Sequence, residues 1–235
     1  MRTITNKPAV SIKDLSFSRS SVPILQNLNL QINQGEHVAL LGSNGSGKST
    51  LLELIIGTLK EDSGMITLAD KQIAFVPQRS AFNDSVPMTV RDTVEMGRWA
   101  KSGSWKRLTR DDRKIVDEQL NRLGITELQS KQLSALSGGQ RQRTLIAQAL
   151  SQEAPLLMLD EPEAGLDADA SRIINDVLRQ EAAKGVAVII ATHDLGSAKN
   201  ATRCVLLSRK EHGIVADGPP EEVLNDQIIA RTFTD

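Results

Sequence analysis

Residues 42–50 read Gly-Ser-Asn-Gly-Ser-Gly-Lys-Ser-Thr and constrain the fold more than any other part of the chain. They match the pattern G-x-x-x-x-G-K-[ST], in which glycines let successive backbone N–H groups turn towards bound phosphates. The apolar run 38–41 predicts a buried strand before this loop. Apolar residues at helical spacing in 51–56 predict a helix after it, with Gly57 near its end. A strand, a glycine-rich loop and a helix predict an α/β unit with an anion-binding helix N-terminus.

This loop contains the first set of candidate binding residues. We expect Lys48 to reach the β- and γ-phosphates of a nucleotide and the Ser49 hydroxyl to complete a Mg²⁺ shell. A chance glycine loop is a poor alternative, because the whole pattern matches in the required context of strand and helix. The residues expected around the phosphates are Gly42, Ser43, Asn44, Gly45, Ser46, Gly47, Lys48, Ser49 and Thr50.

Strand and helix patterns alternate along the rest of the chain. We predict strands at 28–32, 66–68, 73–76, 156–159, 186–190 and 205–207. Residues 89–151 look mainly helical, with stops at Gly103 and Gly124, and 169–184 predicts one more helix. Alternation around a helical insert predicts a mostly parallel sheet covered by helices.

Composition excludes several classes of protein. The 28 basic and 29 acidic residues nearly cancel, which argues against nucleic acid as the main partner. The lone Cys204 cannot form an internal disulfide and is interpreted as a small core residue. Residues 1–10 lack the apolar stretch of a signal peptide, and the longest apolar runs are too short to cross a bilayer. We therefore expect a cytosolic protein.

Two acids follow the apolar run 156–159. An α/β sheet places ligand groups at the carboxyl ends of its strands, where Asp160 and Glu161 stand. Asp160 suits the Mg²⁺ shell, and Glu161 suits polarising an attacking water. Strands often end in acids, so the pair gains its weight from the phosphate loop.

A second possible anion nest precedes the helical run 141–150. It consists of Ser137, Gly138, Gly139 and Gln140. Two glycines and a serine at a helix N-terminus can bind an anion, but Ser137 by itself could be a plain helix cap. Because one compact monomer does not need two phosphate cradles, we expect this nest to close on ATP held by another copy.

Three single residues complete the candidate site. Gln78 follows the strand 73–76, and its amide oxygen could contact Mg²⁺ and water. His193 follows the strand 186–190 and could contact the γ-phosphate, although a lone histidine at a strand end is more often structural. Asp167 could cap the next helix, meet a partner subunit, or do both.

Taken together, these motifs resemble the ABC ATPase family across essentially the whole chain. They occur in the order phosphate loop, glutamine loop, LSGGQ signature, Walker B acids, D-loop and switch histidine. The resemblance implies a single domain, 1–235, with N-terminal antiparallel strands and a mostly parallel core sheet. Its core subdomain would span about 1–86 and 153–235, and its inserted helical subdomain about 87–152. It also implies a head-to-tail dimer sandwiching ATP, with Lys48 and Ser49 on phosphate and Mg²⁺, Glu161 as catalytic base and His193 as switch residue.

Two positions depart from the family pattern. Members usually stack adenine on an aromatic residue shortly before the strand 28–32, and by position that residue is Arg19. A guanidinium plane can also stack on a base, and Phe17 is nearby. Glu163 stands where relatives usually have a small hydroxyl or similar residue, and the sequence gives no account of that change.

Several stretches also resemble importers of manganese, zinc and chelated iron. These are 75–80, 86–92, 96–99 and 110–113. The resemblance implies integral-membrane permease subunits as partners, a substrate-binding protein as an indirect partner, and a peripheral location on the cytoplasmic side of the cell membrane. With three histidines and one cysteine, none clustered, this subunit is not expected to bind the transported metal itself.

Other functions remain possible at this point. Export, or import of another substrate, uses the same chemistry, and a non-transport ABC protein acting on DNA or ribosomes is a further alternative. Such proteins usually carry paired ATPase domains, coiled coils, zinc modules or basic tails, and this chain shows none of these features. The segment after Gln78 is the candidate permease-docking surface, with apolar contacts from Phe82, Val86, Pro87 and Met88. The alternative is that these residues fill the core of the helical subdomain, which fits Val86 and Met88 equally well, whereas Phe82 is the stronger docking candidate because Asn83 and Asp84 beside it indicate an exposed turn.

Overall fold

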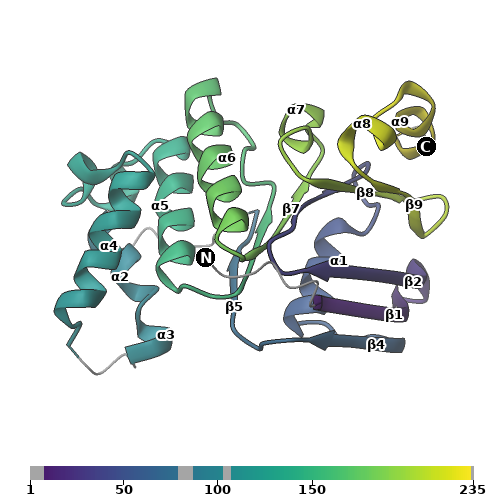
Figure 1. Ribbon diagram of the computed structural model, residues 1–235, viewed down its shortest axis with the longest axis horizontal. Coiled ribbons are helices and arrows are strands. Elements are labelled where there is room, and N and C mark those ends of the chain that lie inside the picture. Colours follow the sequence, from purple (N-terminus) through teal and green to yellow (C-terminus); the bar gives the residue numbers. More distant parts are fainter. Residues whose placement is uncertain (1–7, 79–86, 103–106, 234–235) are drawn as a thin grey trace.

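Two β-sheets and a separate group of helices make up the structure, a computed structural model that describes residues 8–78, 87–102 and 107–233 (Figure 1). Phe82, Val86 and Gly103, which the sequence singled out, lie outside these residues. No helix within the described ranges has both the length and the apolar character needed to cross a membrane.

The larger sheet holds the strands that the apolar runs predict. Its order is β5-β6-β7-β3-β8-β9, and the first five of these strands run parallel. β9 pairs with β8 in the antiparallel direction. The bounds are β3 (His37–Leu41), β5 (Ile73–Val76), β6 (Leu156–Asp160), β7 (Ala187–Thr192), β8 (Arg203–Ser208) and β9 (Gly213–Gly218).

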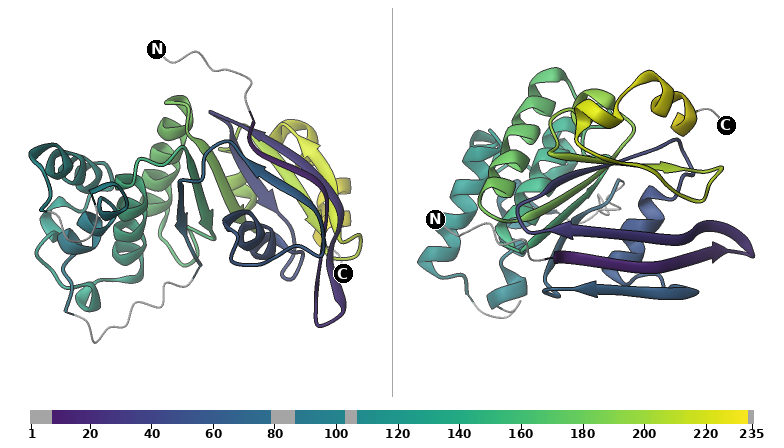
Figure 2. Two further views of the ribbon diagram at one scale, coloured as in Figure 1. Left: turned by 90° about the horizontal axis from the view of Figure 1, so that it is seen from below. Right: turned by 45° about the vertical axis from the view of Figure 1, so that its right-hand side comes forward.

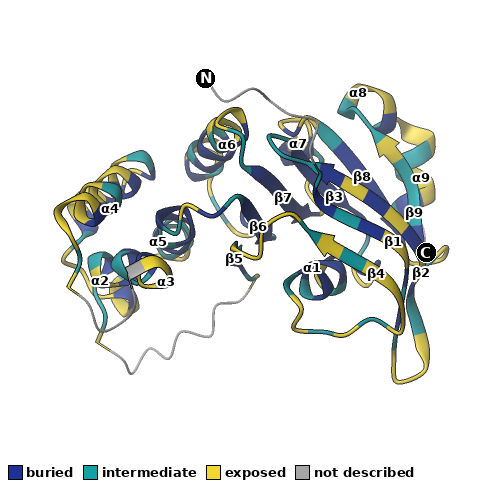
Figure 3. Cartoon of the chain, turned by 60° about the horizontal axis from the view of Figure 1, so that its bottom comes forward, coloured by how far each residue is buried: buried dark blue, intermediate teal, exposed yellow. Residues whose placement is uncertain are grey.

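Every residue of β3, β6 and β7 is buried, because both faces of the sheet are covered (Figure 3). Alternate residues point into different cores. Ala39 and Leu41 join one cluster with residues of the helices α2 (Val90–Met96), α4 (Arg110–Arg122), α5 (Gly138–Ser151) and α6 (Ala168–Ala183). Val38 and Leu40 join another cluster with residues of the helix α1 (Lys48–Ile56) and of the smaller sheet. The central strands therefore read as continuous apolar runs.

The smaller sheet is antiparallel, with the order β2-β1-β4. Its strands are β1 (Pro8–Arg19), β2 (Val22–Asn33) and β4 (Ser63–Leu68). The two views in Figure 2 show helix α1 (Lys48–Ile56) between this sheet and the larger one, and Leu51, Leu52 and Ile55 fill the space between them. The N-terminal antiparallel strands are thus present as expected.

The helices between β5 and β6 stand together at one side of the molecule (Figure 1). They are α2 (Val90–Met96), α3 (Trp99–Ser102), α4 (Arg110–Arg122) and α5 (Gly138–Ser151), with short 3₁₀ turns at Thr126–Leu128 and Leu133–Ala135. Gly124 adopts a φ of 61° just after α4, in agreement with the predicted stop. All of these helices fall within 87–152, and the division into two subdomains stays a prediction.

Two tight contacts hold α2, α4 and α5 together. A Cβ atom on Gly97 would collide with the Ser151 Oγ atom and the Gln148 carbonyl oxygen, so the end of α2 lies directly on α5. The buried Arg98 guanidinium donates to Asp112 at 2.9 Å and to the Ser151 carbonyl oxygen at 2.6 Å. The helices are therefore joined by close backbone approach and by a buried ion pair.

The remaining helices follow the strands of the larger sheet. They are α6 (Ala168–Ala183), α7 (Leu195–Ala198), α8 (Pro220–Val223) and α9 (Asp226–Phe233). The predicted helix at 169–184 corresponds to α6. Cys204 is fully buried on β8, and burial raises the pKa of its thiol to about 12, in keeping with a core residue.

Candidate active site

The loop between β3 and α1 takes the shape that its glycines permit. Gly47, the N-cap of α1, has a φ of 96°, and Gly42 has a φ of 156°. A Cβ atom on Gly42 would collide with the Leu207 carbonyl oxygen and the Ser46 hydroxyl, and one on Gly47 would lie 2.9 Å from the Leu25 side chain. Both positions combine a left-handed backbone with a close neighbour, so neither accepts a side chain without strain.

Lys48 is the first residue of α1 and is folded back over this loop. Its side chain is buried, and Nζ donates to the carbonyl oxygens of Gly42 at 2.8 Å and Ser43 at 3.1 Å. Burial lowers the pKa of Lys48, while the nearby carboxylates of Glu161 and Asp160 act in the opposite direction. The ammonium group is therefore held at the mouth of the loop, close to two acids.

The strand order brings β6, β7 and β3 side by side, so their carboxyl ends meet at one edge of the sheet. Asp160 at the end of β6 is buried, and its Oδ1 atom has no hydrogen-bond partner among the described residues. Burial raises the pKa of Asp160, and a hydrogen bond from the Ser49 hydroxyl opposes that rise. A buried carboxylate oxygen without a donor, next to a hydroxyl, fits the oxygen ligands that Mg²⁺ prefers.

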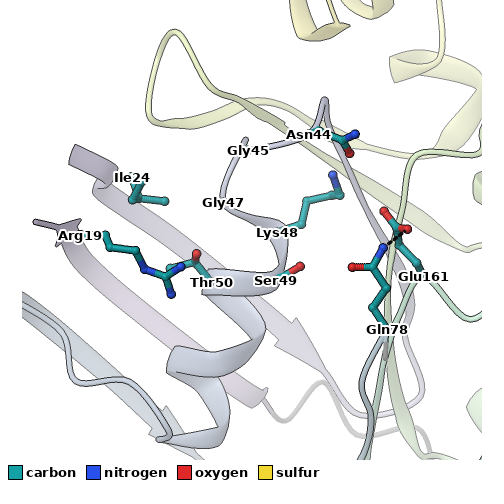
Figure 4. A pocket seen from close by; sticks show the side chains of 10 residues that line it. All are labelled: Arg19, Ile24, Asn44, Gly45, Gly47, Lys48, Ser49, Thr50, Gln78 and Glu161. Atoms are coloured by element: carbon teal, nitrogen blue, oxygen red, sulfur yellow. Dashed lines mark hydrogen bonds between the residues drawn. The ribbon is translucent and has the colours of Figure 1, made fainter. Parts of the chain in front are cut away.

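Glu161 lies between two other predicted site residues. The Nε2 atom of Gln78, just after β5, donates to its Oε2 atom at 2.5 Å, and the Nδ1 atom of His193 is 3.2 Å from its Oε1 atom. Figure 4 shows the Gln78 amide oxygen pointing towards Ser49 and away from Glu161. Glu161 has a φ of 47°, a conformation that costs energy outside glycine and is common at functional sites.

A cavity of about 420 Å³ runs from the acids to the end of β1 (Figure 4). Its lining consists of Arg19, Ile24, Asn44, Gly45, Gly47, Lys48, Ser49, Thr50, Gln78 and Glu161. Arg19 stands at the end opposite the acids, where its side chain is 62% exposed and its Nη2 atom is 3.7 Å from Glu53 Oε2. Phe17 is buried in the core beside the smaller sheet, so it does not offer a stacking face to this cavity.

Comparison with known proteins identifies the family. The ABC transporter family model matches residues 25–164, more than half of the chain. The chain is an ABC transporter ATP-binding subunit. The manganese transport system ATP-binding protein MntB of Halalkalibacterium halodurans is 36% identical over 233 residues, covering 96% of this chain and 92% of the relative. The zinc uptake system ATP-binding protein ZurA of Listeria innocua is 34% identical over 224 residues, covering 91% and 86%.

A solved structure with the same fold is that of a dimeric bacterial ABC transporter cassette. It is 26% identical in sequence, covers 90% of this chain and 98% of its own, and superposes with a TM-score of 0.77. Family membership makes this chain an ATP-binding protein whose ATP hydrolysis is coupled to transport. The cavity at the phosphate loop is accordingly the candidate ATP site.

The signature residues of this ABC ATPase lie away from its own ATP cavity. Ser137 is the N-cap of α5 and forms a capping box with Gln140, and none of Ser137, Gly138, Gly139 and Gln140 lines the cavity. Asp167 caps α6 by accepting from the Ala170 backbone N–H at 2.8 Å. The capping interpretations are therefore confirmed, and the roles towards a second subunit stay predictions.

A second cavity of about 240 Å³ is lined by Glu161 and His193. Its lining includes Glu163, Ser171 and Asp194, of which only Glu163 stood out in the sequence. Asp194 is the N-cap of α7, where its carboxylate accepts from the Gly196 and Ser197 backbone N–H groups. The pattern of an Asp followed three residues later by Ser could have indicated that cap.

Proposed function

We propose that this subunit hydrolyses ATP to drive import of a divalent metal or metal chelate through a membrane permease. The observation that carries the proposal is that Gln78 and His193 both contact Glu161, and that Gln78 and Glu161 line the cavity that the phosphate loop also lines. The cargo class is supported by relatives named for manganese transport and zinc uptake. Because the manganese relative and the zinc relative are similarly identical to this chain, at 36% and 34%, the proposal covers both metals.

The phosphate loop provides the binding half of the proposed mechanism. Its backbone N–H groups and the N-terminus of α1 would surround the phosphates, and Lys48 would exchange its two carbonyl partners for phosphate oxygens. Ser49, Gln78 and Asp160 would hold Mg²⁺, whose positive charge would offset the negative charge of the phosphates. Arg19 and Ile24 would contact the adenine at the opposite end of the cavity.

The group at Glu161 provides the reactive half. Glu161 would orient the attacking water and take up its proton on a carboxylate oxygen. Gln78 already donates to this carboxylate, which fixes its plane. His193 lies on the other side of the same carboxylate, where its ring would contact the γ-phosphate and keep Glu161 facing the water.

A second copy would complete the site. The residues 137–140 present a serine hydroxyl and backbone N–H groups at the N-terminus of α5, and they do not line the chain's own ATP cavity. In a head-to-tail dimer this nest would close on the γ-phosphate held by the partner, and Asp167 would lie at the contact. The similarity to a dimeric cassette supports this arrangement.

The membrane partner would be a permease bound at the cytoplasmic side of the cell membrane, with a substrate-binding protein delivering the cargo to it. The test is uptake of radiolabelled manganese and zinc by cells in which the only copy of this subunit carries Glu161→Gln. We expect uptake of one metal to be lost, while the exposed control Glu127→Gln keeps it. Unchanged uptake of both metals in the Glu161→Gln cells would contradict the import of manganese or zinc by this subunit.

A further inference from the structure

Glu163 is a partly buried acid that the mechanism above does not use. It lies on the loop between β6 and α6, two residues after Glu161, and it lines the 240 Å³ cavity. Its Oε1 atom is buried and has no hydrogen-bond partner among the described residues. A buried carboxylate oxygen without a donor costs free energy, so this position requires an explanation.

The surroundings of Glu163 contain acceptors and negative charge. The Asn175 side chain, from α6, is within hydrogen-bonding reach of the carboxyl group, and the Asn175 Oδ1 atom is buried and also without a partner among the described residues. From the loop after β7, Asp194 and His193 face the same cavity, and Glu161 faces it from the end of β6. Among the residues that the structure describes, no lysine or arginine lines this cavity.

A proton on Glu163 accounts both for the buried oxygen atoms without partners and for the nearby negative charge of Asp194. The protonated carboxyl group can donate a hydrogen bond to Asn175 once the amide is turned so that its oxygen, rather than its N–H₂ group, faces Glu163, and a carboxylate cannot donate such a bond. It also removes one of two like charges, because Asp194 keeps its charge: hydrogen bonds from Ser197, first its hydroxyl, lower the pKa of Asp194.

We propose that Glu163 is a positioning residue whose protonated form holds the loop after β6 against the loop after β7, and thereby keeps His193 beside Glu161. This inference rests on the proposed function, since it assigns Glu163 an effect on those two residues. Ionised Glu163 repels Asp194, next to His193 in sequence, and loosens the 3.2 Å contact between His193 and Glu161. ATP hydrolysis is therefore faster when Glu163 is protonated.

The titration of Glu163 falls where this switch would operate. Burial raises its pKa to about 7, and the charge of Asp194 raises it as well, while the contact with Asn175 has a smaller lowering effect than burial. The protonated form then predominates below pH 7 and the ionised form above it. A rise in pH from 6 to 8 changes the protonated fraction by about tenfold.

The test compares Glu163→Gln with the wild-type chain from pH 6 to pH 8 in steady-state ATP hydrolysis. Glutamine keeps the shape and cannot ionise, so the ratio of kcat, variant over wild type, is expected to rise about tenfold across this range. KM for ATP should change in parallel in the two proteins, because Glu163 does not line the ATP cavity. The matched control is Asp169→Asn, an exposed acid in the first turn of α6, for which the ratio should stay level.

A level ratio for Glu163→Gln would overturn the inference while leaving the proposed function intact. If the variant does not fold, the carboxyl carbon of Glu163 is titrated by NMR in the wild-type chain. A midpoint near 7 supports the inference, and a midpoint near the ordinary 4.5 overturns it. Absence of ATP hydrolysis by the wild type would instead contradict the proposed function, and the NMR titration would still decide the state of Glu163.

Discussion

The Nδ1 atom of His193 lies 3.2 Å from the Oε1 atom of Glu161, although the two residues belong to different strand ends. The contact exists because β6 and β7 are neighbours in the sheet, paired from Leu156 with Ala187 to Asp160 with Ala191. The Glu161 backbone N–H also donates to the Ala191 carbonyl oxygen at 2.8 Å. Backbone pairing therefore sets the distance between the proposed base, Glu161, and the proposed switch residue, His193.

Replacing Glu161 with Gln is expected to lower ATP hydrolysis by roughly 10²–10⁴-fold, because a positioned base contributes about that factor. ATP binding should survive, since Lys48 and the phosphate loop are unchanged. Steady-state hydrolysis and equilibrium nucleotide binding are the two measurements. The variant should also accumulate as an ATP-bound dimer in size-exclusion chromatography with light scattering. Hydrolysis near the wild-type rate would contradict the assignment of Glu161 as the catalytic base.

Arg19→Ala is expected to weaken ATP binding by about two- to fivefold, because a cation stacked on a ring at an exposed site contributes roughly 0.5–1 kcal/mol. Arg19→Tyr should retain or improve the affinity. Glu53→Gln is the control, since it removes the ion pair at 3.7 Å and leaves Arg19 in place. Titration with a fluorescent ATP analogue measures all three. If neither Arg19 variant changes the affinity, the adenine is held elsewhere.

Gly97→Ala should destabilise the chain by about 1–3 kcal/mol, because the new methyl group collides with Ser151 and the Gln148 carbonyl oxygen. Urea unfolding gives the free-energy difference. Gly213→Ala is the matched control, since its methyl group would meet carbonyl oxygens at an ordinary 3.7 Å. Equal stability of the two variants would show that α2 and α5 separate more easily than the contact implies.

His37 predicts a pH dependence of folding stability. Its side chain is fully buried, both ring nitrogens lack partners among the described residues, and burial, helped by the charge of Arg179, lowers its pKa from 6.5 to about 4. The unfolded chain therefore takes up a proton at a higher pH than the folded chain. The neutral His37 side chain thus contributes to the free energy of unfolding in full above pH 6.5, and this contribution is lost as the pH falls to 4.

The size of this contribution is about 3 kcal/mol. Urea unfolding of the wild type between pH 7 and pH 4 should show the decline, and His37→Leu should remove that part of the slope. A variant with the same slope as the wild type would mean that the histidine is not responsible.

The sequence predicted the parts of the fold in which a single pattern dominates. The strands β3, β6, β7 and β8 are apolar on both faces, so each was located from its residues. The loop at 42–50 was located because its residue pattern is highly specific. β1 was not located from its own residues, because shifts in register around Asp14 and Phe17 interrupt its alternation, and only the family resemblance implied N-terminal strands. β9 contains small and polar residues at the edge of the sheet and was missed.

The candidate site was predictable as a set of residues and less so as a geometry. The sequence motifs pointed to Gln78, Glu161 and His193. Only the strand order shows that Gln78 and His193 both contact the Glu161 carboxylate. The surroundings of Glu163 depend on how α6 and the loop after β7 pack together. Asn175 and Asp194 carry no local signal of that contact, because it joins segments far apart in the chain.

The central position of β3 has a consequence for how this protein is made. β3 is complete at Leu41, yet its two partners are β7 and β8, which begin at Ala187 and Arg203. A ribosome therefore releases a mostly apolar strand long before the strands that pair with either of its edges have been synthesised. Contacts this distant in sequence form slowly, and exposed apolar strands aggregate. Nascent chains that end before Ala187, the first residue of β7, should depend on chaperones. ATP binding should appear only late in synthesis.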